Sequence, residues 1–470
     1  MSNRIGKLIY NNLITQLNSL QMNKIGEKMK LFTKTILASV AVLAVLLIIL
    51  MPEVSADDGT ATSVIDNVDM LWVGVASLLV FIMTPGLALF YGGMLRKQSM
   101  TSTIAQSLMA MGVVMFMWMI VGYSLAFDGD VGGVVGGLDH IFMIGVSYDS
   151  STLGLTIPDM GFLVFQGMFS IVTACILIGA TTERVRFPAI MAFLILWTVL
   201  VYAPMAHMVW GGGLLSTAFG AIVSLDYAGG TVVHICSAIT GVAIALVVGK
   251  RSVRTIKDRP HNIPLMFLGA VLIWFGWFGF NGGSGLAVDG IMVNAIATTL
   301  VSSVVAMVVW ILLQMLLVGR ASVTGMCAGL VAGLVAITPG CAFVDVTAAM
   351  VIGAVASIIC YGGIKFMRER SGVDDALDVF GLHGFGAIWG AIATGIFALP
   401  ALTDTPGLLY GGVDLFVGQF LAVGFTLVYC FVVSFVIMKS LSKVMRIRLT
   451  DEEEMIGADV IDHGESAYNW

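Results

Sequence analysis

The feature that most constrains this chain is a series of apolar runs, most of them long enough to cross a membrane. An α-helix needs about 20 apolar residues to span the hydrocarbon core of a bilayer, where only helices and closed barrels satisfy their backbone hydrogen bonds. After residue 56, eleven runs lie at 71–93, 103–127, 160–181, 187–205, 228–249, 264–283, 289–318, 322–338, 343–364, 380–399 and 413–438. We therefore predict an all-α integral membrane protein with eleven transmembrane helices, of which 322–338 is at the lower limit of length.

The composition supports a membrane protein built from helices. Only 11% of the residues are charged, compared with about 25% in soluble domains. The 55 glycines suit closely packed membrane helices, whereas a transmembrane barrel would show short alternating segments. The six cysteines nearly all lie inside apolar runs without metal-binding spacing. We therefore expect no disulfide framework, no metal, no cofactor and no nucleic-acid partner, with lipid surrounding the chain.

The basic residues test the helix count. After residue 56, every Lys and Arg falls in an alternate gap between the runs, and the intervening gaps carry Asp but neither Lys nor Arg. A miscounted helix would scramble this alternation. Because cytoplasmic loops carry the excess of Lys and Arg, we predict that the first helix starts outside and that the C-terminus is cytoplasmic.

Residues 1–56 precede this pattern. The stretch from Met29 has a basic start, an apolar core and small residues at Val54 and Ala56, which is typical of a secretory signal peptide. We favour a signal peptide at 29–56 over an uncleaved first helix, which the charge pattern equally permits. Residues 1–28 are then a polar leader of unknown role.

Two short matches indicate an internal repeat. GLALFYGG at 86–93 and GWFGFNGG at 276–283 share G-x-x-x-F-x-G-G, and HICSAITG at 234–241 and HGFGAIWG at 383–390 share H-x-x-x-A-I-x-G. The matches pair the first helix with the sixth and the fifth with the tenth. Since five is odd, the second copy must enter the membrane from the opposite side. We predict a five-plus-five inverted repeat with the substrate path between its halves.

His234 and His383 occupy equivalent positions in this repeat, near the middle of the membrane. A two-fold axis in the membrane plane could bring them face to face. Each could simply be a buried histidine bonded to a backbone carbonyl, but two symmetry-related ionisable groups in a membrane favour a function. A neutral histidine pair suits a path for a small polar molecule or a proton relay, and does not suit a bare inorganic cation.

Aromatic residues near the outer face form a second candidate site. Phe165 and Phe169 share a helix face, as do Phe280 and Ser284, and Trp210 lies in an outer loop or at a helix end. These residues could hold a small cation by cation–π attraction, although spacing alone favours an aromatic belt at the membrane interface.

Asp226 stands just before the helix that carries His234. We favour an N-cap role, in which its carboxylate accepts backbone N–H groups of Ala228 to Gly230. The alternative is a direct cation ligand, which would bind a cation too tightly for fast release.

Several stretches together resemble the ammonium transporter family (Amt/Mep/Rh). They are PGLALFYGG at 85–93, DYAGGTVVH at 226–234, GFNGGS at 279–284, AITPG at 336–340 and DVFGLHG at 378–384. The resemblance covers about residues 70 to 470. The family's eleven helices, external N-terminus and pseudo-two-fold repeat agree with the helix count, charge pattern and repeat above.

The resemblance implies a homotrimer in the cell membrane with one pore per subunit, and an ammonium transporter domain at 57–438. It also implies roles for individual residues: an outer ammonium-recruiting site of Phe165, Phe169, Trp210 and Ser284, an aromatic gate of Phe169 and Phe280, pore histidines His234 and His383, and Asp226 as an aspartate required for transport. The presence of Trp210 and Ser284 favours the Amt branch over the Rh branch.

The last residues, 439–470, form a polar, acidic tail that could be unstructured. It resembles the Amt tail that couples subunits and docks a PII-type nitrogen regulatory protein, so we expect a cytoplasmic regulatory tail.

We therefore expect a transporter rather than an enzyme. It would recruit NH4+ outside, remove its proton and conduct NH3 through the apolar pore, because a neutral species avoids the cost of burying a charge. The alternatives are an Rh-type neutral gas channel and a membrane ammonium sensor with little flux. Trp210 and Ser284 argue against the first, and the tail is too short for the kinase or cyclase output domain of a fused sensor.

Overall fold

The described chain is built from helices. The computed structural model describes residues 64–216, 222–252 and 260–468. Within these ranges the only β-type contacts are two isolated bridges, Val131 with Val135 and Val185 with Arg448. The predicted leader at 1–28 and signal peptide at 29–56 lie outside the described residues.

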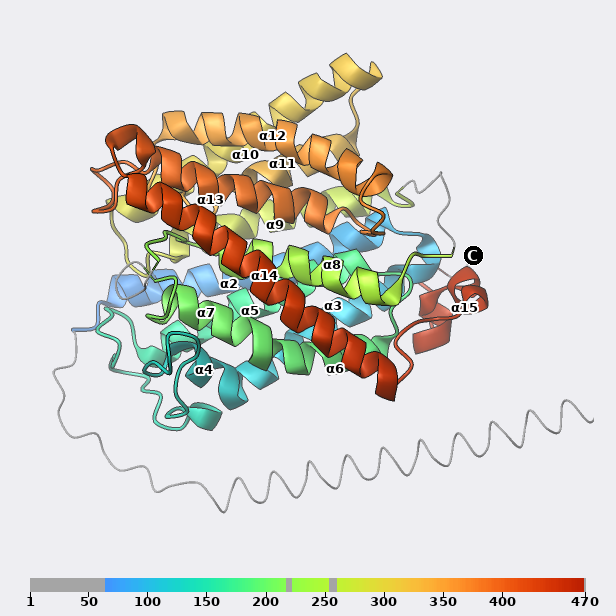
Figure 1. The fold of residues 1–470 in the computed structure, drawn as a ribbon, viewed down its shortest axis with the longest axis horizontal. Helices are drawn as coiled ribbons and strands as arrows, with labels where there is room; N and C mark the ends of the chain where they lie inside the picture. Colours follow the sequence, from blue (N-terminus) through green and yellow to red (C-terminus); the bar gives the residue numbers. More distant parts are fainter. Residues whose placement is uncertain (1–63, 217–221, 253–259, 469–470) are drawn as a thin grey trace, which may run out of the picture. The chain divides into compact units, whose positions relative to one another are not determined.

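Ten helical segments in the described part of the chain are long and apolar enough to cross a membrane. Most run along a common direction in Figure 1. They are α2 (Asn67–Met94); η1 (Lys97–Ser99), α3 (Met100–Met117), η2 (Trp118–Gly122) and α4 (Tyr123–Phe127) as one segment; α5 (Asp159–Thr181); α6 (Phe187–Trp197), η4 (Thr198–Tyr202) and α7 (Ala203–Trp210) as one segment; η5 (Gly230–Ile235) with α8 (Cys236–Val248); α9 (Ile263–Gly283); α10 (Gly290–Val318); α12 (Val346–Glu369); η6 (Phe380–Gly384) with α13 (Phe385–Phe397); and α14 (Val413–Val444).

A further apolar helix, α11 (Val323–Ile337), corresponds to the predicted run 322–338 but has only 15 residues. At 1.5 Å per residue it is about 22 Å long, which is shorter than the ~30 Å hydrocarbon core. Every predicted run thus forms a helix, ten of them of membrane-spanning length. Short helices η3 (Ile141–Met143), η7 (Leu408–Tyr410), α15 (Asp451–Ile456) and η8 (Asp459–His463) lie in the connections and the tail.

The connections between helices meet at two ends of the bundle. At one, which we call the basic end, Glu183 pairs with Arg96 at 2.9 Å and with Arg251 at 2.6 Å. At the other, the acidic end, Asp69 accepts hydrogen bonds from Thr156 and from the backbone of Val288. Loops that are far apart in the sequence therefore lie together, with the loops that contain Lys and Arg at one end and the Asp-containing loops at the other, as the alternation of basic residues predicts.

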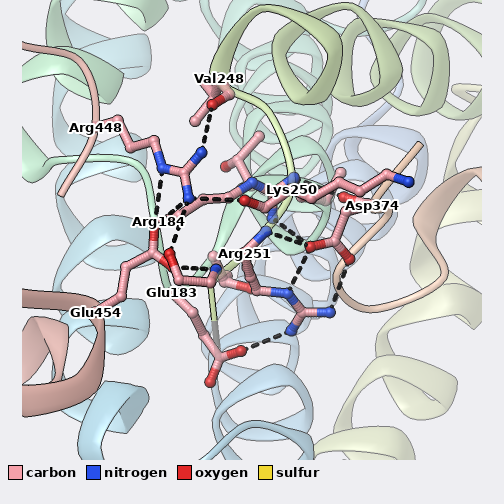
Figure 2. Close-up of polar contacts among 12 residues, drawn as sticks. Glu183, Arg184, Val248, Lys250, Arg251, Asp374, Arg448 and Glu454 are labelled. Carbon is pink, nitrogen blue, oxygen red and sulfur yellow. Dashed lines mark hydrogen bonds and ion pairs between the residues drawn. The ribbon is translucent and has the colours of Figure 1, made fainter. Parts of the chain in front are cut away.

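The tail is folded rather than unstructured. α14 continues to Val444, six residues beyond the predicted boundary at 438, and the chain then returns along the basic end. Arg448 donates to the Glu454 carboxylate at 2.9 Å and to the carbonyls of Val248 and Lys250 at 3.0 and 2.7 Å (Figure 2). Further along, Asp462 pairs with Arg186 at 3.1 Å.

The ion pairs of Figure 2 join this tail to the loops that lead into the bundle. Arg251 bridges Glu183 and Asp374, and Arg184, which is fully buried, donates to the carbonyl of Asp374 at 2.6 Å. Burial alone would raise the pKa of the Asp374 carboxyl, but the hydrogen bonds and charge of Arg251 hold this pKa at about 2. The loop before η6 is therefore fixed by charges at the basic end.

Candidate functional site

The two predicted histidines meet inside the bundle. His234 lies in η5 and His383 in η6, and both elements are π-helical turns at the start of a longer helix. Their Nδ1 atoms are 3.2 Å apart, and their rings lie nearly parallel with centroids 5.3 Å apart. His234 is fully buried and His383 almost so. Because a neutral imidazole donates at one nitrogen and accepts at the other, the pair can share one hydrogen bond without carrying a charge.

An aromatic stack continues from His234 toward the acidic end. Phe280 lies 5.9 Å from the His234 ring and stacks on Phe169 at 4.3 Å, and the edge of Phe169 meets Trp210 at 5.9 Å. The sequence Trp210, Phe169, Phe280, His234, His383 is therefore a continuous series of ring contacts. Each of these side chains comes from a different helical segment: α7, α5, α9, η5 and η6.

Trp277 supports this series from the side. Its ring stacks on His234 with centroids 5.2 Å apart, and its Nε1 donates to the hydroxyl of Thr338 at 2.9 Å. Trp277 is not among the residues predicted from the sequence. Its position three residues before Phe280 could have identified it, because this spacing places both rings on one face of α9.

A cavity of about 500 Å³ opens beside this stack. Phe169, Trp210 and Ser284 line it, as do Gln166 and Tyr227, which the sequence analysis did not name. Its lining contains no charged side chain. The Ser284 hydroxyl donates to the carbonyl of Phe280 at 2.7 Å, so its oxygen remains an acceptor toward the cavity. Aromatic faces with a hydroxyl oxygen are suited to a small organic or ammonium-type cation.

Phe165 does not line this cavity. Its ring is fully buried and packs against Phe169, with centroids 5.0 Å apart. A Cβ placed on Gly283 would lie 2.9 Å from the Phe165 ring, so the ring fills the space between α5 and α9. In this structure Phe165 supports Phe169 from behind rather than facing the cavity.

Asp226 caps the helix that carries His234. Its carboxylate accepts the backbone N–H groups of Gly229, Gly230 and Thr231 at 2.8, 2.6 and 2.7 Å, and also the Thr231 hydroxyl. The accepted groups begin one residue later than expected, because the chain turns at Gly229, which has a φ of 105°, before the helix starts. The Val232 N–H adds a fifth, longer hydrogen bond at 3.4 Å, so the carboxylate is occupied by the protein's own groups.

A second carboxylate mirrors this cap at the basic end, and the sequence analysis missed it. Asp375 accepts the backbone N–H groups of Val379 and Phe380 at 2.9 and 2.7 Å, at the start of the helix that carries His383. Burial, reinforced by the charge of Asp378, raises the pKa of the Asp375 carboxyl to about 7. The available signal was spacing, since each aspartate precedes its histidine by eight residues in the sequence.

Within the described residues no cluster of three or more metal-ligating side chains occurs. The six cysteines are all free and buried. What the arrangement offers chemically is an uncharged cavity, an aromatic constriction and a pair of hydrogen-bonding rings in apolar surroundings.

The model of the Ammonium Transporter Family matches residues 71–468. The ammonium transporter of Bacillus subtilis is 42% identical over 402 residues, covering 85% of this chain and 98% of that protein. The ammonium transporter Amt1 of Archaeoglobus fulgidus is 39% identical, with 85% and 99% covered.

Two solved structures are also similar. The crystal structure of Saccharomyces cerevisiae Mep2 has a TM-score of 0.77 at 33% identity, covering 83% of this chain and 89% of that one. A structure described as a sensor Amt protein has a TM-score of 0.76 at 27% identity, covering 84% and 98%.

Proposed function

Because this chain belongs to the ammonium transporter family, we propose that it recruits NH4+ at the cavity lined by Phe169, Trp210 and Ser284, removes its proton and conducts NH3 past His234 and His383. The relatives are named as transporters rather than enzymes, and the chain is a multi-pass membrane protein. The observation that carries the proposal is the continuous series of ring contacts from the cavity to the histidine pair.

The physical argument rests on where charge is tolerated. The cavity offers aromatic faces and a hydroxyl oxygen, which replace part of the hydration of a cation. In the Phe169–Phe280 stack the two ring faces cover each other, with centroids 4.3 Å apart, and neither ring has an oxygen or nitrogen that could replace the hydration of an ion. Beyond it, the histidines offer hydrogen bonds without a carboxylate or an ammonium group. A neutral molecule passes such a path far more cheaply than an ion, and potassium, which has no proton to lose, is excluded.

The remaining features of the proposal follow the family. We propose eleven crossings in a five-plus-five inverted repeat, with the acidic end outside and the basic end and tail in the cytoplasm of the cell membrane. The unit is proposed to be a homotrimer whose tail docks a PII-type nitrogen regulatory protein. The charge alternation of the connections and the matched positions of Asp226 and Asp375 support this arrangement.

Uptake of methylammonium into proteoliposomes tests the proposal against its two rivals. In this proposal the removed proton also crosses to the inside along the hydrogen-bonded pair of His234 and His383, so that one positive charge enters with each NH3. Uptake should then saturate and should increase with an inside-negative membrane potential. A neutral gas channel would give flux that ignores the potential. The similarity to a sensor Amt protein makes the third outcome, no flux in correctly assembled protein, a specific alternative.

Replacing either histidine by alanine tests the conduction step. In His234→Ala or His383→Ala the apolar path loses one of its two hydrogen-bonding rings, so selective uptake should be abolished or potassium should leak. Parallel measurements of methylammonium and rubidium uptake distinguish these results. Full selective transport in both single variants would overturn the assigned role.

A further inference from the structure

A fully buried histidine outside the proposed pathway has both ring nitrogens engaged. His207 lies in α7, one turn before Trp210, and its side chain is inaccessible to solvent. Its Nδ1 lies 3.0 Å from the carbonyl oxygen of Ala126, and its Nε2 lies 2.9 Å from a carboxylate oxygen of Asp130. A carbonyl only accepts hydrogen bonds, so Nδ1 donates to Ala126. Nε2 shares a second hydrogen bond with Asp130, and the ring is therefore held from both sides.

Asp130 is the partner of this ring in the loop after α4. The hydrogen bond from His207 lowers the pKa of the Asp130 carboxyl, which is half exposed at the acidic end. The sequence has no Lys or Arg between Lys97 and Arg184, nor between Arg186 and Lys250. These segments therefore offer Asp130 a histidine partner and no Lys or Arg.

The hydrogen bond between His207 and Asp130 joins two segments that both line the cavity. On one side is the loop after α4, in which Asp130 also accepts the backbone N–H of Gly133 at 2.9 Å. On the other is the end of α7, where the backbone N–H groups of Gly211 and Gly213 donate to the His207 carbonyl at 2.9 and 3.1 Å. The Leu214 N–H donates to the Gly133 carbonyl at 2.7 Å, which is a second link between the loop after α4 and the segment after α7.

The space around the ring leaves little room for adjustment. A Cβ on Gly211 would lie 2.1 Å from the Ala126 carbonyl oxygen and 2.7 Å from His207 Nδ1. Phe127, next to Ala126, and Trp210, one turn after His207, both line the cavity. The position of the Trp210 ring relative to Phe127, across the cavity lining, therefore depends on how firmly His207 is held.

We propose that the buried hydrogen bond between His207 and Asp130 positions Trp210 and so sets the affinity of the cavity for ammonium. The inference rests on the proposed function, in which Trp210 binds the cation. His207 acts through Trp210 and is a positioning residue. When the hydrogen bond to Asp130 is removed, the ring is held on one side only and the end of α7 is held less tightly.

Other titratable groups face the same region and need separate controls. In the loop, His140 pairs with Asp128 at 2.6 Å, and Asp139 lies beside them. On the elements that pack against α7, the Asp226 carboxylate is taken up by its cap, and Tyr123 and Tyr202 are buried phenols. His140, which does not line the cavity, is the matched control histidine.

The experiment is methylammonium uptake into proteoliposomes, with KM and kcat measured for each variant. His207→Gln should raise KM about three- to tenfold with kcat within about twofold, because the hydrogen bonds of the ring to Ala126 and Asp130 are lost. Asp130→Ala should raise KM in the same way, whereas Asp130→Asn, whose amide can still share a hydrogen bond with the ring, should keep KM close to the wild-type value. His140→Gln should keep the wild-type KM.

Asp130 is half exposed, so its alanine variant tests the proposal even if His207→Gln assembles poorly. Hydrogen exchange of the Gly211–Leu215 amides should be faster in His207→Gln than in the wild type. Wild-type KM values in both His207→Gln and Asp130→Ala would overturn the inference. Trp210→Leu distinguishes a failure of the proposed function from a failure of this inference. If Trp210→Leu leaves KM unchanged, the recruiting site itself is wrong. If Trp210→Leu raises KM while the His207 and Asp130 variants do not, only the positioning role of His207 is refuted.

Discussion

At the scale of single residues, the site depends on carboxylates that bind the N-termini of helices and do not bind a ligand. Asp226 and Asp375 each accept backbone N–H groups at the start of a helix that carries a histidine. A helix start offers unpaired N–H groups and the positive end of the helix dipole, which a carboxylate satisfies. The histidine positions therefore depend on groups that never face the cavity.

The cap at Asp226 predicts different outcomes for two substitutions. Asp226→Asn keeps one acceptor oxygen, whereas Asp226→Ala leaves the N–H groups of Gly229 to Thr231 without their acceptor. Loss of a cap costs about 0.5–2 kcal/mol on going to Ala and less to Asn. We expect partial transport in the Asn variant and an inactive or poorly assembled Ala variant, compared by transport rate and yield of assembled protein.

The same pair of variants can contradict this account. If Asn abolishes transport as completely as Ala while both proteins assemble normally, the charge of Asp226 acts on the ammonium ion itself.

Asp375 predicts a pH dependence of stability. Its folded pKa of about 7 lies above its ordinary value of 3.8, so the folded protein binds a proton more tightly than the unfolded chain. The favourable contribution is fully present below about pH 4 and is lost as the pH rises to about 7. The thermal midpoint of the purified protein should decline over this window, and Asp375→Asn should flatten the decline. Equal slopes in the two proteins would show that Asp375 is not the titrating group.

At the scale of elements, the closest packing joins α2 and α9, the two helices that the first repeat match pairs. Membrane helices gain stability by close approach of small residues rather than by the hydrophobic effect. A Cβ on Gly93 in α2 would lie 2.6 Å from the backbone N of Met266 and 2.7 Å from the carbonyl oxygen of Asn262. This contact fixes α9, which carries Trp277 and Phe280.

Gly93→Ala should therefore destabilise the protein, because the added methyl group meets backbone atoms that cannot rotate away. Overpacking of this kind costs about 1–3 kcal/mol. Gly74→Ala is the control in the same helix, since a Cβ there has no atom within 4 Å. The thermal midpoint in detergent should fall for Gly93→Ala and stay unchanged or rise for Gly74→Ala. A similar midpoint in both variants would refute the close approach of α2 and α9.

At the scale of the whole molecule, the connections separate by charge into two ends, and the tail closes the basic one. Arg448 contacts both Glu454 and the loop after α8, while Arg251 ties that loop to the segment before η6. The basic end is therefore a charged surface made of distant parts of the chain, whereas the residues that line the cavity lie toward the acidic end.

This separation predicts the orientation of the chain in the membrane. A reporter fused after Trp470 should behave as cytoplasmic, and a tag inserted between Asp130 and Asp149 should be reachable from outside the cell. The physical reason is the retention of Lys and Arg on the cytoplasmic side. A protected tag together with an external reporter would invert the arrangement and contradict the proposed direction of recruitment.

The sequence by itself determined the helices and which connections share an end. The cost of placing charges and unpaired backbone groups in lipid confines them to predictable lengths and gaps, so the local pattern was sufficient. Tertiary structure alone decided that His234 meets His383, that Trp210 contacts Phe169 and that Phe165 lies behind it. It also decided that the tail is folded and that Asp375 caps a helix. These contacts join residues up to hundreds of positions apart, and they depend on how helices pack, which local hydrophobic pattern does not specify.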